Sequence, residues 1–215
     1  MTWAVEHFSE VMELTWTHAV LAGVPLLLGL ALAVPLGWLA RRHAWLYAPL
    51  VVGTGLLYTI PSLALFILMP LVLGTTILDP LNVVVAMTIY TVALLVRTVA
   101  DGLNAVPDDI AQAATAMGYK GVRRLFGVEL PLATPVIAAG LRVAAVSNVS
   151  IVSIASLIGV SQLGELLIDG YNRVIWGELL TGIVACVLLA LAFDAFIVLG
   201  TRLVTPWLQV QGARA

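Results

Sequence analysis

The side chains that most often do chemistry in proteins are few in this chain, and they form no catalytic set. His7, His18 and His43 are scattered, and Cys186, the single cysteine, stands inside an apolar run. The sequence contains no HExxH zinc motif, no Ser/His/Asp spacing and no GxxxxGK(S/T) phosphate loop. A single cysteine also excludes an intrachain disulfide and a cysteine metal cluster. Polar chemistry is concentrated instead in residues 108–131, DDIAQAATAMGYKGVRRLFGVELP, where it suits the binding of a partner.

The first half of this polar segment has the pattern of a short helix that ends in a sharp turn. Asp108 or Asp109 can cap a helix after Pro107, because acidic side chains are favoured in a first helical turn. Gly118 suits the left-handed backbone position that ends such a helix. Helical spacing predicts one apolar face formed by Ile110, Ala113, Ala114 and Met117. The small alanines on that face would let a partner backbone approach closely.

The second half of the polar segment predicts another short helix, which leads into an apolar run. Val122, Leu125 and Phe126 share one side of it, and Pro131 fits the first turn of the next helix. The side chains predicted to face solvent are Lys120, Arg123 and Arg124. Two short helices joined by a turn would stand out of the membrane as a docking surface. An ordinary connecting loop is the alternative.

Composition places the rest of the chain in a membrane. The 215 residues are 61% hydrophobic and only 10% charged, whereas soluble domains carry about 25% charged residues. About 20 apolar residues cross a bilayer, and the apolar runs, which contain only Arg142 and Asp194 as charges, are 14–40, 44–78, 80–96, 132–158 and 179–201. Pro61 and Pro70 break the second run, so one tilted span plus an interrupted piece is predicted, with two full spans as the alternative. We therefore predict an all-α polytopic membrane protein, with one domain over residues 1–215 and five transmembrane helices.

The charged residues sort to opposite sides of these spans. If the N-terminus lies outside, the basic residues of the inner segments are Arg41, Arg42, Arg97, Lys120, Arg123, Arg124, Arg202 and Arg214. The outer segments contain only Arg173 among the basic residues, and they collect Glu6, Glu10, Glu13, Asp79, Glu165, Asp169 and Glu178. The positive-inside rule then predicts an outer N-terminus, an inner C-terminus and a cytoplasmic polar segment. The first fourteen residues contain no Lys or Arg, unlike a signal peptide, so the first span is expected to remain as an anchor.

The polar segment resembles the coupling-loop motif of binding-protein-dependent ABC importer permeases, which implies a coupling loop at about 104–131. That motif runs Glu-Ala-Ala, three residues, Gly, and then Pro thirteen residues after the Gly. Ala113, Ala114, Gly118 and Pro131 stand at the matching positions here. Gln112 replaces the Glu, which removes a charge but keeps a side-chain acceptor, so the start of the helix should survive.

The resemblance covers most of the chain. Residues 55–66, 101–120 and 128–146 are similar to the quaternary-ammonium branch of these permeases, which imports glycine betaine, choline, carnitine or related osmolytes. Methionine-type permeases are the nearest alternative. The resemblance implies that the residues coupling the chain to an ATPase are Gln112, Ala113, Ala114, Met117, Gly118, Tyr119, Lys120, Arg123 and Pro131.

The same resemblance implies partners. They are a cytoplasmic ABC ATPase dimer, which would carry the ATP and magnesium, a second permease subunit that is either this chain or a paralogue, and an extracytoplasmic substrate-binding protein. The chain itself is expected to bind no cofactor and no metal, to be no enzyme, and to have no nucleic-acid partner. It is expected to lie among the lipids of a bacterial cytoplasmic membrane, and the outer loop at 159–178 is a candidate surface for the binding protein.

Candidates for the substrate path come from polar and aromatic residues in the spans. A stripe along the fourth span contains Ser147, Asn148, Ser150, Ser153 and Ser156. Such a stripe either lines a water-filled cavity or holds helices together. Tyr58 can attract a cation through its aromatic face, although tyrosine also anchors spans at the membrane surface.

Charged residues within or beside the spans are the remaining polar feature. Arg142 and Asp194 lie inside spans, and Arg97 and Asp101 form an i, i+4 pair. Charges at such depth are costly, so pairing is expected, with a role in gating as the alternative.

These features favour the permease subunit of an ATP-driven importer for quaternary-ammonium osmolytes. Import of methionine or another small amino acid is the alternative within the same class. An autonomous channel or secondary carrier is the alternative from a different class, and a membrane enzyme has no constellation of residues to support it.

Overall fold

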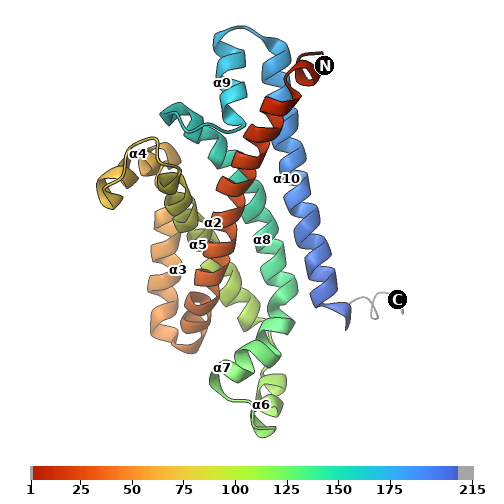
Figure 1. The fold of residues 1–215 in the computed structure, drawn as a ribbon. Helices are drawn as coiled ribbons and strands as arrows, with labels where there is room; N and C mark the ends of the chain where they lie inside the picture. The colour runs from red at the N-terminus through yellow and green to blue at the C-terminus, as the bar shows by residue number, and fades with distance from the viewer. Residues whose placement is uncertain (1, 208–215) are drawn as a thin grey trace.

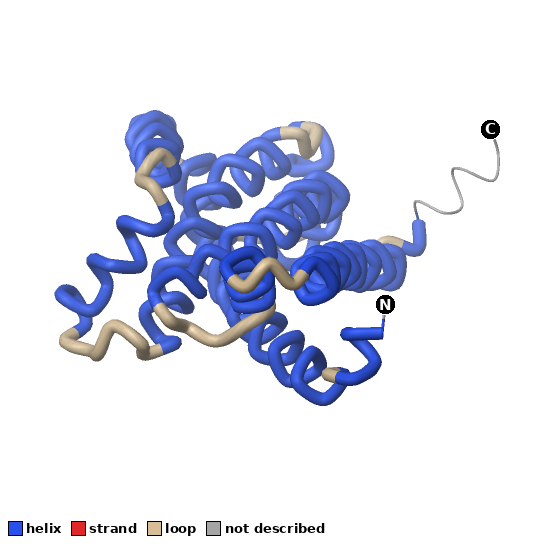
Figure 2. The backbone as a smooth tube through the Cα atoms, turned by 90° about the horizontal axis from the view of Figure 1, so that it is seen from above, coloured by secondary structure: helices blue, strands red, loops and turns tan. Residues whose placement is uncertain are grey.

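The computed structural model describes residues 2–207, and every regular element in that range is a helix or a helical turn (Figure 2). The elements are α1 (Thr2–Glu6), α2 (Phe8–Arg42), α3 (Ala44–Tyr58), α4 (Ser62–Leu73), α5 (Pro80–Asn104), α6 (Asp108–Ala116), α7 (Gly121–Arg124), a π turn (Leu125–Glu129), α8 (Leu130–Val152), a 3-10 turn (Ser153–Ile158), α9 (Gly164–Asn172) and α10 (Trp176–Val204). The long helices run side by side, with α6 and α7 at one end and α9 at the other (Figure 1). Arg214, which was assigned to the inner side, lies outside the described residues.

Four helical segments are long and apolar enough to cross a membrane, and a bent pair can supply a fifth span. The four are α2, α5, the continuous stretch 121–158 that contains α8, and α10. Together with the bent pair they confirm the five predicted spans. Four of the predicted runs fall within these segments, although α5 continues beyond residue 96 to Asn104. The run at 44–78 extends past the bent pair, whose second helix ends at Leu73.

The bent pair consists of α3 and α4, which meet at an angle of 102°. Pro61 stands at the N-cap of α4, where its missing N–H costs nothing. Helix α3 has 15 residues and α4 has 12, or about 23 and 18 Å, so neither alone crosses a hydrocarbon core of about 30 Å. The second run can therefore supply one interrupted span and not two full spans. Pro70 does not break it, because Pro70 lies inside α4 and the helix ends only at Gly74.

Helix α5 lies at the centre of the bundle and is buried along most of its length. Its start is fixed by Asp79, whose side chain accepts a hydrogen bond from the Leu81 N–H at 2.9 Å. Helices α2 and α8 pack on α5 through glycines. A Cβ atom at Gly29 of α2, or at Gly140 of α8, would lie 2.4 Å from the methyl carbon of Thr91 or Thr98 of α5, respectively. Small residues at such crossings let helix backbones approach closely.

Candidate functional site

The predicted coupling segment folds as a helix followed by a tight turn. Helix α6 begins at Asp108 with Pro107 as its N-cap, and the Asp109 carboxylate accepts a hydrogen bond from the Ile110 N–H at 2.9 Å. The helix ends at Ala116, and Gly118 follows with φ of 90°. That angle lies in the left-handed region that favours glycine. The predicted first helix and its glycine turn are therefore confirmed, including the survival of the helix start beside Gln112.

Helix α6 turns most of its apolar side chains away from the rest of the chain. Ala111 and Ala114 are buried, whereas Ile110 and Ala113 are exposed and Met117 has 71% of its surface exposed. The predicted apolar face is thus divided, because Ala114 packs against its own chain. The remaining three residues form an exposed apolar surface, which is the kind of surface that a soluble partner covers.

The second helix of the segment is shorter than predicted. Helix α7 has only 4 residues and continues through the π turn into α8, with Pro131 in the first turn of α8 as predicted. The expected common apolar side is wrong, because Leu125 is buried while Val122 and Phe126 are exposed. A π turn shifts the direction in which successive side chains point, which separates residues that α-helical spacing would align.

The basic side chains of this segment have different surroundings. Lys120 is exposed, and the guanidinium carbon of Arg123 lies 4.9 Å from the centre of the Tyr119 ring. Arg124 was predicted to face solvent, and this is correct only in part, since 34% of its side chain is exposed. Its guanidinium turns inward to Glu129, because a buried carboxylate requires a paired cation.

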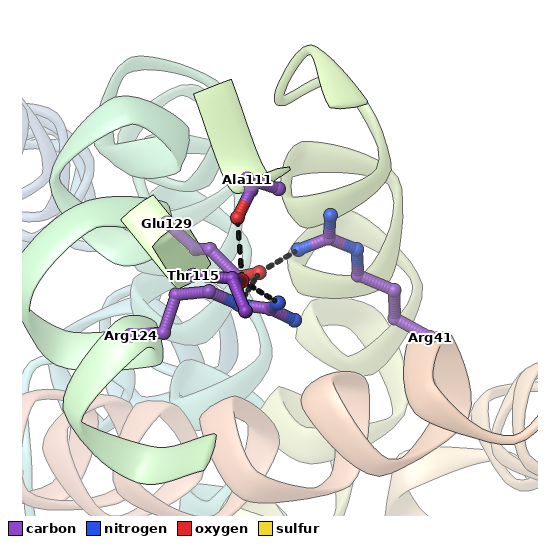
Figure 3. Close-up of polar contacts among 5 residues, drawn as sticks. All are labelled: Arg41, Ala111, Thr115, Arg124 and Glu129. Atoms are coloured by element: carbon purple, nitrogen blue, oxygen red, sulfur yellow. Dashed lines mark hydrogen bonds and ion pairs between the residues drawn. The ribbon is translucent and has the colours of Figure 1, made fainter. Parts of the chain in front are cut away.

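Glu129 joins the coupling segment to the membrane helices (Figure 3). Only 1% of its side chain is exposed, and its Oε1 lies 3.1 Å from Nη1 of Arg41 and 2.9 Å from Nε of Arg124. Arg124 also donates from Nη1 to the Thr115 hydroxyl at 3.0 Å, and that hydroxyl donates to the Ala111 carbonyl at 2.8 Å. These contacts, which involve Arg41, Glu129, Arg124, Thr115 and the Ala111 carbonyl, are called the Glu129 network below.

No sequence pattern singled out Glu129 beyond its place beside Leu130 and Pro131. A signal was nevertheless present. Glu129 is an acidic residue at the edge of an apolar run, close to a cluster of basic residues. Such a carboxylate either reaches solvent or finds a basic partner, and the partners come from two separate parts of the chain.

Gln112 lies on the surface of a cavity of about 590 Å³ beside this network. The side chains of Arg41, Lys120 and Arg124 also line the cavity, together with Asp108 as the one acidic group. Positive charge therefore dominates there. A neutral glutamine at position 112 leaves more net positive charge on the cavity than a glutamate would.

The predicted polar stripe of α8 separates into packing and exposed residues. Asn148 is 3% exposed, and its Nδ2 donates to the Ala22 carbonyl of α2 at 3.2 Å and to the Thr91 hydroxyl of α5 at 3.0 Å. This amide therefore holds three helices together, so its candidacy for the substrate path is withdrawn. Ser150 is exposed, and Ser147 is half-buried.

The remaining members of the stripe lie near the end of α8. The Ser153 hydroxyl donates to the Ser150 carbonyl at 2.6 Å, and the Ser156 hydroxyl donates to the Ser153 carbonyl at 2.7 Å. Tyr58, the aromatic candidate, packs edge-on against Tyr90 with 5.5 Å between the ring centres.

The charged residues of the spans are paired, as expected. Arg142 of α8 and Asp194 of α10 form a two-point contact, with N–O distances of 2.6 and 2.9 Å. Arg97 and Asp101 lie 3.5 Å apart within α5, and the Tyr47 hydroxyl donates to Asp101 at 2.9 Å. The pair between Arg142 and Asp194 ties α10 to α8, which sequence spacing could not reveal.

A second buried polar cluster lies near the opposite end from α6. His18 is fully buried, with Nδ1 at 2.7 Å from Oε1 of Gln162 and Nε2 at 2.9 Å from the Val149 carbonyl. Gln162 in turn accepts from the Gly164 N–H at 2.6 Å and donates to the Val152 carbonyl at 3.1 Å. The sequence marked His18 only as an isolated histidine, whereas in the structure it connects the segment before α9 to α2 and α8.

Comparisons with known proteins agree with this architecture. Residues 26–210 match the family described as binding-protein-dependent transport system inner membrane component. The chain is 36% identical over 193 residues to the osmoprotectant import permease protein OsmW of Salmonella typhimurium, covering 88% of this chain and 89% of that protein. It is 29% identical over 213 residues to the choline transport system permease protein OpuBD of Bacillus subtilis, covering 97% of this chain and 88% of that protein.

Solved structures share the fold. An inward-facing structure of the MetNI methionine ABC transporter superposes with a TM-score of 0.81 at 20% identity, over 91% of this chain and 96% of that chain. A crystal structure of an amino acid ABC transporter superposes with a TM-score of 0.67 at 18% identity, over 94% of this chain and 95% of that chain. The chain thus shares its overall fold with these transporter chains. Because the family match at residues 26–210 covers most of its length, the chain belongs to the family of binding-protein-dependent transport system inner membrane components.

Proposed function

We propose that this chain is the transmembrane permease subunit of an ATP-driven importer whose substrates are quaternary-ammonium osmolytes such as glycine betaine, choline and carnitine. The observation that carries the proposal is the similarity to an osmoprotectant import permease, at 36% identity over 88% of the chain. The similarity to a choline permease over 97% of the chain supports the same substrate class.

In this proposal α6 docks on a cytoplasmic ABC ATPase. The exposed apolar residues of α6 supply the contact surface, and Gly118 sets the direction of the segment after it. The proposed docking residues are Gln112, Ala113, Ala114, Met117, Gly118, Tyr119, Lys120, Arg123 and Pro131. Ala114 and Pro131 act by shaping the segment, since Ala114 is buried and Pro131 begins α8. ATP and magnesium bind the ATPase.

The remaining partners follow from the two ends of the bundle. The end that carries α6 faces the cytoplasm, and the end that carries α9 faces an extracytoplasmic substrate-binding protein. This places the N-terminus outside, with the C-terminus inside, as the sorting of basic residues favours. A second permease subunit completes the membrane part, in the cytoplasmic membrane of a bacterium.

Docking is tested by co-purification. The chain is expressed in membranes together with its cognate ABC ATPase, solubilised in mild detergent and isolated through a tag on the permease alone. A stable complex that contains the ATPase is expected. A chain that carries solute in liposomes without any ATPase would instead establish an autonomous carrier.

The substrate class is tested by uptake in proteoliposomes that contain the complete importer. Labelled glycine betaine, choline and carnitine are expected to accumulate with ATP, and labelled methionine is not. Accumulation of methionine with none of the three osmolytes would overturn the substrate class and leave the permease function intact.

A further inference from the structure

Helix α6 has little apolar attachment to the rest of its own chain. Of its nine residues only Ala111 and Ala114 are buried, and each of these side chains is a single methyl group. A docking helix can move the spans only if a displacement at its surface reaches them. The connection therefore has to come from another kind of contact.

The Glu129 network supplies this connection through four segments of the chain. Arg41 stands in the last turn of α2, and Glu129 ends the π turn that leads into α8. Arg124 ends α7, and Thr115 lies in the last turn of α6. Each contact between these side chains is 3.1 Å or shorter, so the chain of contacts is continuous from α2 to the backbone of α6 (Figure 3).

Arg124 has the one position in the network that requires a branched cation. Its Nε lies 2.9 Å from Glu129 Oε1 as an ion pair without hydrogen-bond geometry, and its Nη1 donates to the Thr115 hydroxyl, so one rigid guanidinium contacts both groups. A lysine ammonium can neutralise Glu129, but it lacks the fixed fork that reaches two partners in set directions. Burial of Glu129 strengthens its hold on both arginines, because little water screens the charges.

We propose that Glu129, Arg124 and Thr115 are positioning residues that make α6 move together with α2 and α8. A displacement of α6 at the ATPase then shifts the spans directly, and the loop does not bend by itself. The proposal rests on the proposed function, since it presumes that α6 docks on an ATPase. None of the three residues touches the substrate in this mechanism.

The test compares substrate moved with ATP consumed. Importers reconstituted in proteoliposomes carry Thr115→Val, which keeps the side-chain shape and removes the hydroxyl, or Arg124→Lys, which keeps the charge and removes the fork. Labelled glycine betaine uptake and phosphate release are measured on the same samples. Both variants are expected to bind wild-type amounts of ATPase and to hydrolyse ATP, while glycine betaine transported per ATP falls several-fold.

Two matched variants show whether the network itself is responsible. Thr115→Ser keeps the hydroxyl and is expected to restore the wild-type ratio. Arg42→Lys changes a neighbouring arginine that stacks on Trp38, 5.3 Å from its ring centre, and it should leave the ratio unchanged.

Each other outcome has a defined meaning. A wild-type ratio in both Thr115→Val and Arg124→Lys would overturn the proposal. So would a proportional loss of assembled complex, hydrolysis and uptake, because that pattern marks a role in folding or docking alone. If the wild-type chain binds no ATPase, the proposed function fails, and the network remains a structural tie.

Discussion

At the scale of single residues, the turn after α6 depends on one backbone angle. Gly118 has φ of 90°, and no atom lies within 4 Å of the place where a Cβ would stand. The cost of a side chain at this position is therefore backbone strain and not collision. An L-residue in the left-handed region costs about 1–2 kcal/mol, and asparagine is the best tolerated after glycine.

Replacing Gly118 by valine is expected to reorient the segment after α6. Gly118→Val should lower ATP-dependent uptake at least tenfold, because the turn relaxes to an ordinary φ and moves Tyr119 and Lys120. Gly118→Asn is the matched control and should retain most uptake. Uptake by the valine variant at the wild-type rate would show that the direction of the turn is unimportant for coupling.

The pairing of His18 with Gln162 gives a second prediction at the residue scale. His18→Leu removes the ring nitrogens that contact Gln162 and the Val149 carbonyl in a fully buried place, although Gln162 Oε1 keeps the hydrogen bond from the Gly164 N–H. An unsatisfied buried group costs about 1–3 kcal/mol, so the thermal unfolding temperature in detergent should fall. If the two side chains act as a pair, the double variant His18→Leu with Gln162→Leu should lose less stability than the sum of the losses in the two single variants. Strict additivity would show that they are independent.

At the scale of elements, the bundle depends on close helix crossings over α5. Gly140 of α8 faces Thr98 of α5 with no room for a Cβ atom, whereas nothing lies within 4 Å of a Cβ at Gly53 of α3. The two glycines are both inside helices, so they differ mainly in what surrounds them.

Valine should impair folding at Gly140 and leave it unaffected at Gly53. Gly140→Val is expected to force α8 away from α5 at a cost of about 1–3 kcal/mol, which lowers the yield of monodisperse protein in size-exclusion chromatography. Gly53→Val should leave the yield unchanged. Equal yields for the two variants would mean that α8 can shift on α5 without penalty.

The elements were predictable to different degrees. The five apolar runs and the helix at 108–116 follow from composition and from spacing along the chain, which depend on neighbouring residues. The angle of 102° between α3 and α4 does not, because Pro61 marks a break without fixing its direction. The π turn before α8 was also not predictable, and it is the reason why Val122 and Leu125 point to different surroundings.

At the scale of the whole molecule, the exposed side of α6 stands apart from the membrane bundle (Figure 1). Met117 has 71% of its surface exposed at that end, and Val5 of α1 has 77% exposed in the opposite half of the molecule. An isolated permease should tolerate a charge at either place, because neither side chain is packed.

A charge on the docking surface should separate assembly from folding. Met117→Asp is expected to leave the unfolding temperature of the isolated permease unchanged and to reduce co-purified ATPase at least tenfold, because docking would bury the new carboxylate without a partner. Val5→Asp is the matched control and should keep the ATPase bound. Full ATPase recovery with Met117→Asp would place the docking surface elsewhere.

The membrane class, the apolar runs, the sorting of charge and the helix with its glycine turn can all be deduced from the order of residues. These properties depend on hydropathy and on residues close together in the chain. Which distant side chains meet is visible only in the folded chain: Arg41 with Glu129, Arg142 with Asp194, and Asn148 with the backbone of α2. Buried polar groups take whichever partner the packing brings within about 3 Å, and no local pattern specifies that partner. The same reason turned Arg124 from a predicted solvent-facing residue into the link between α6 and the spans.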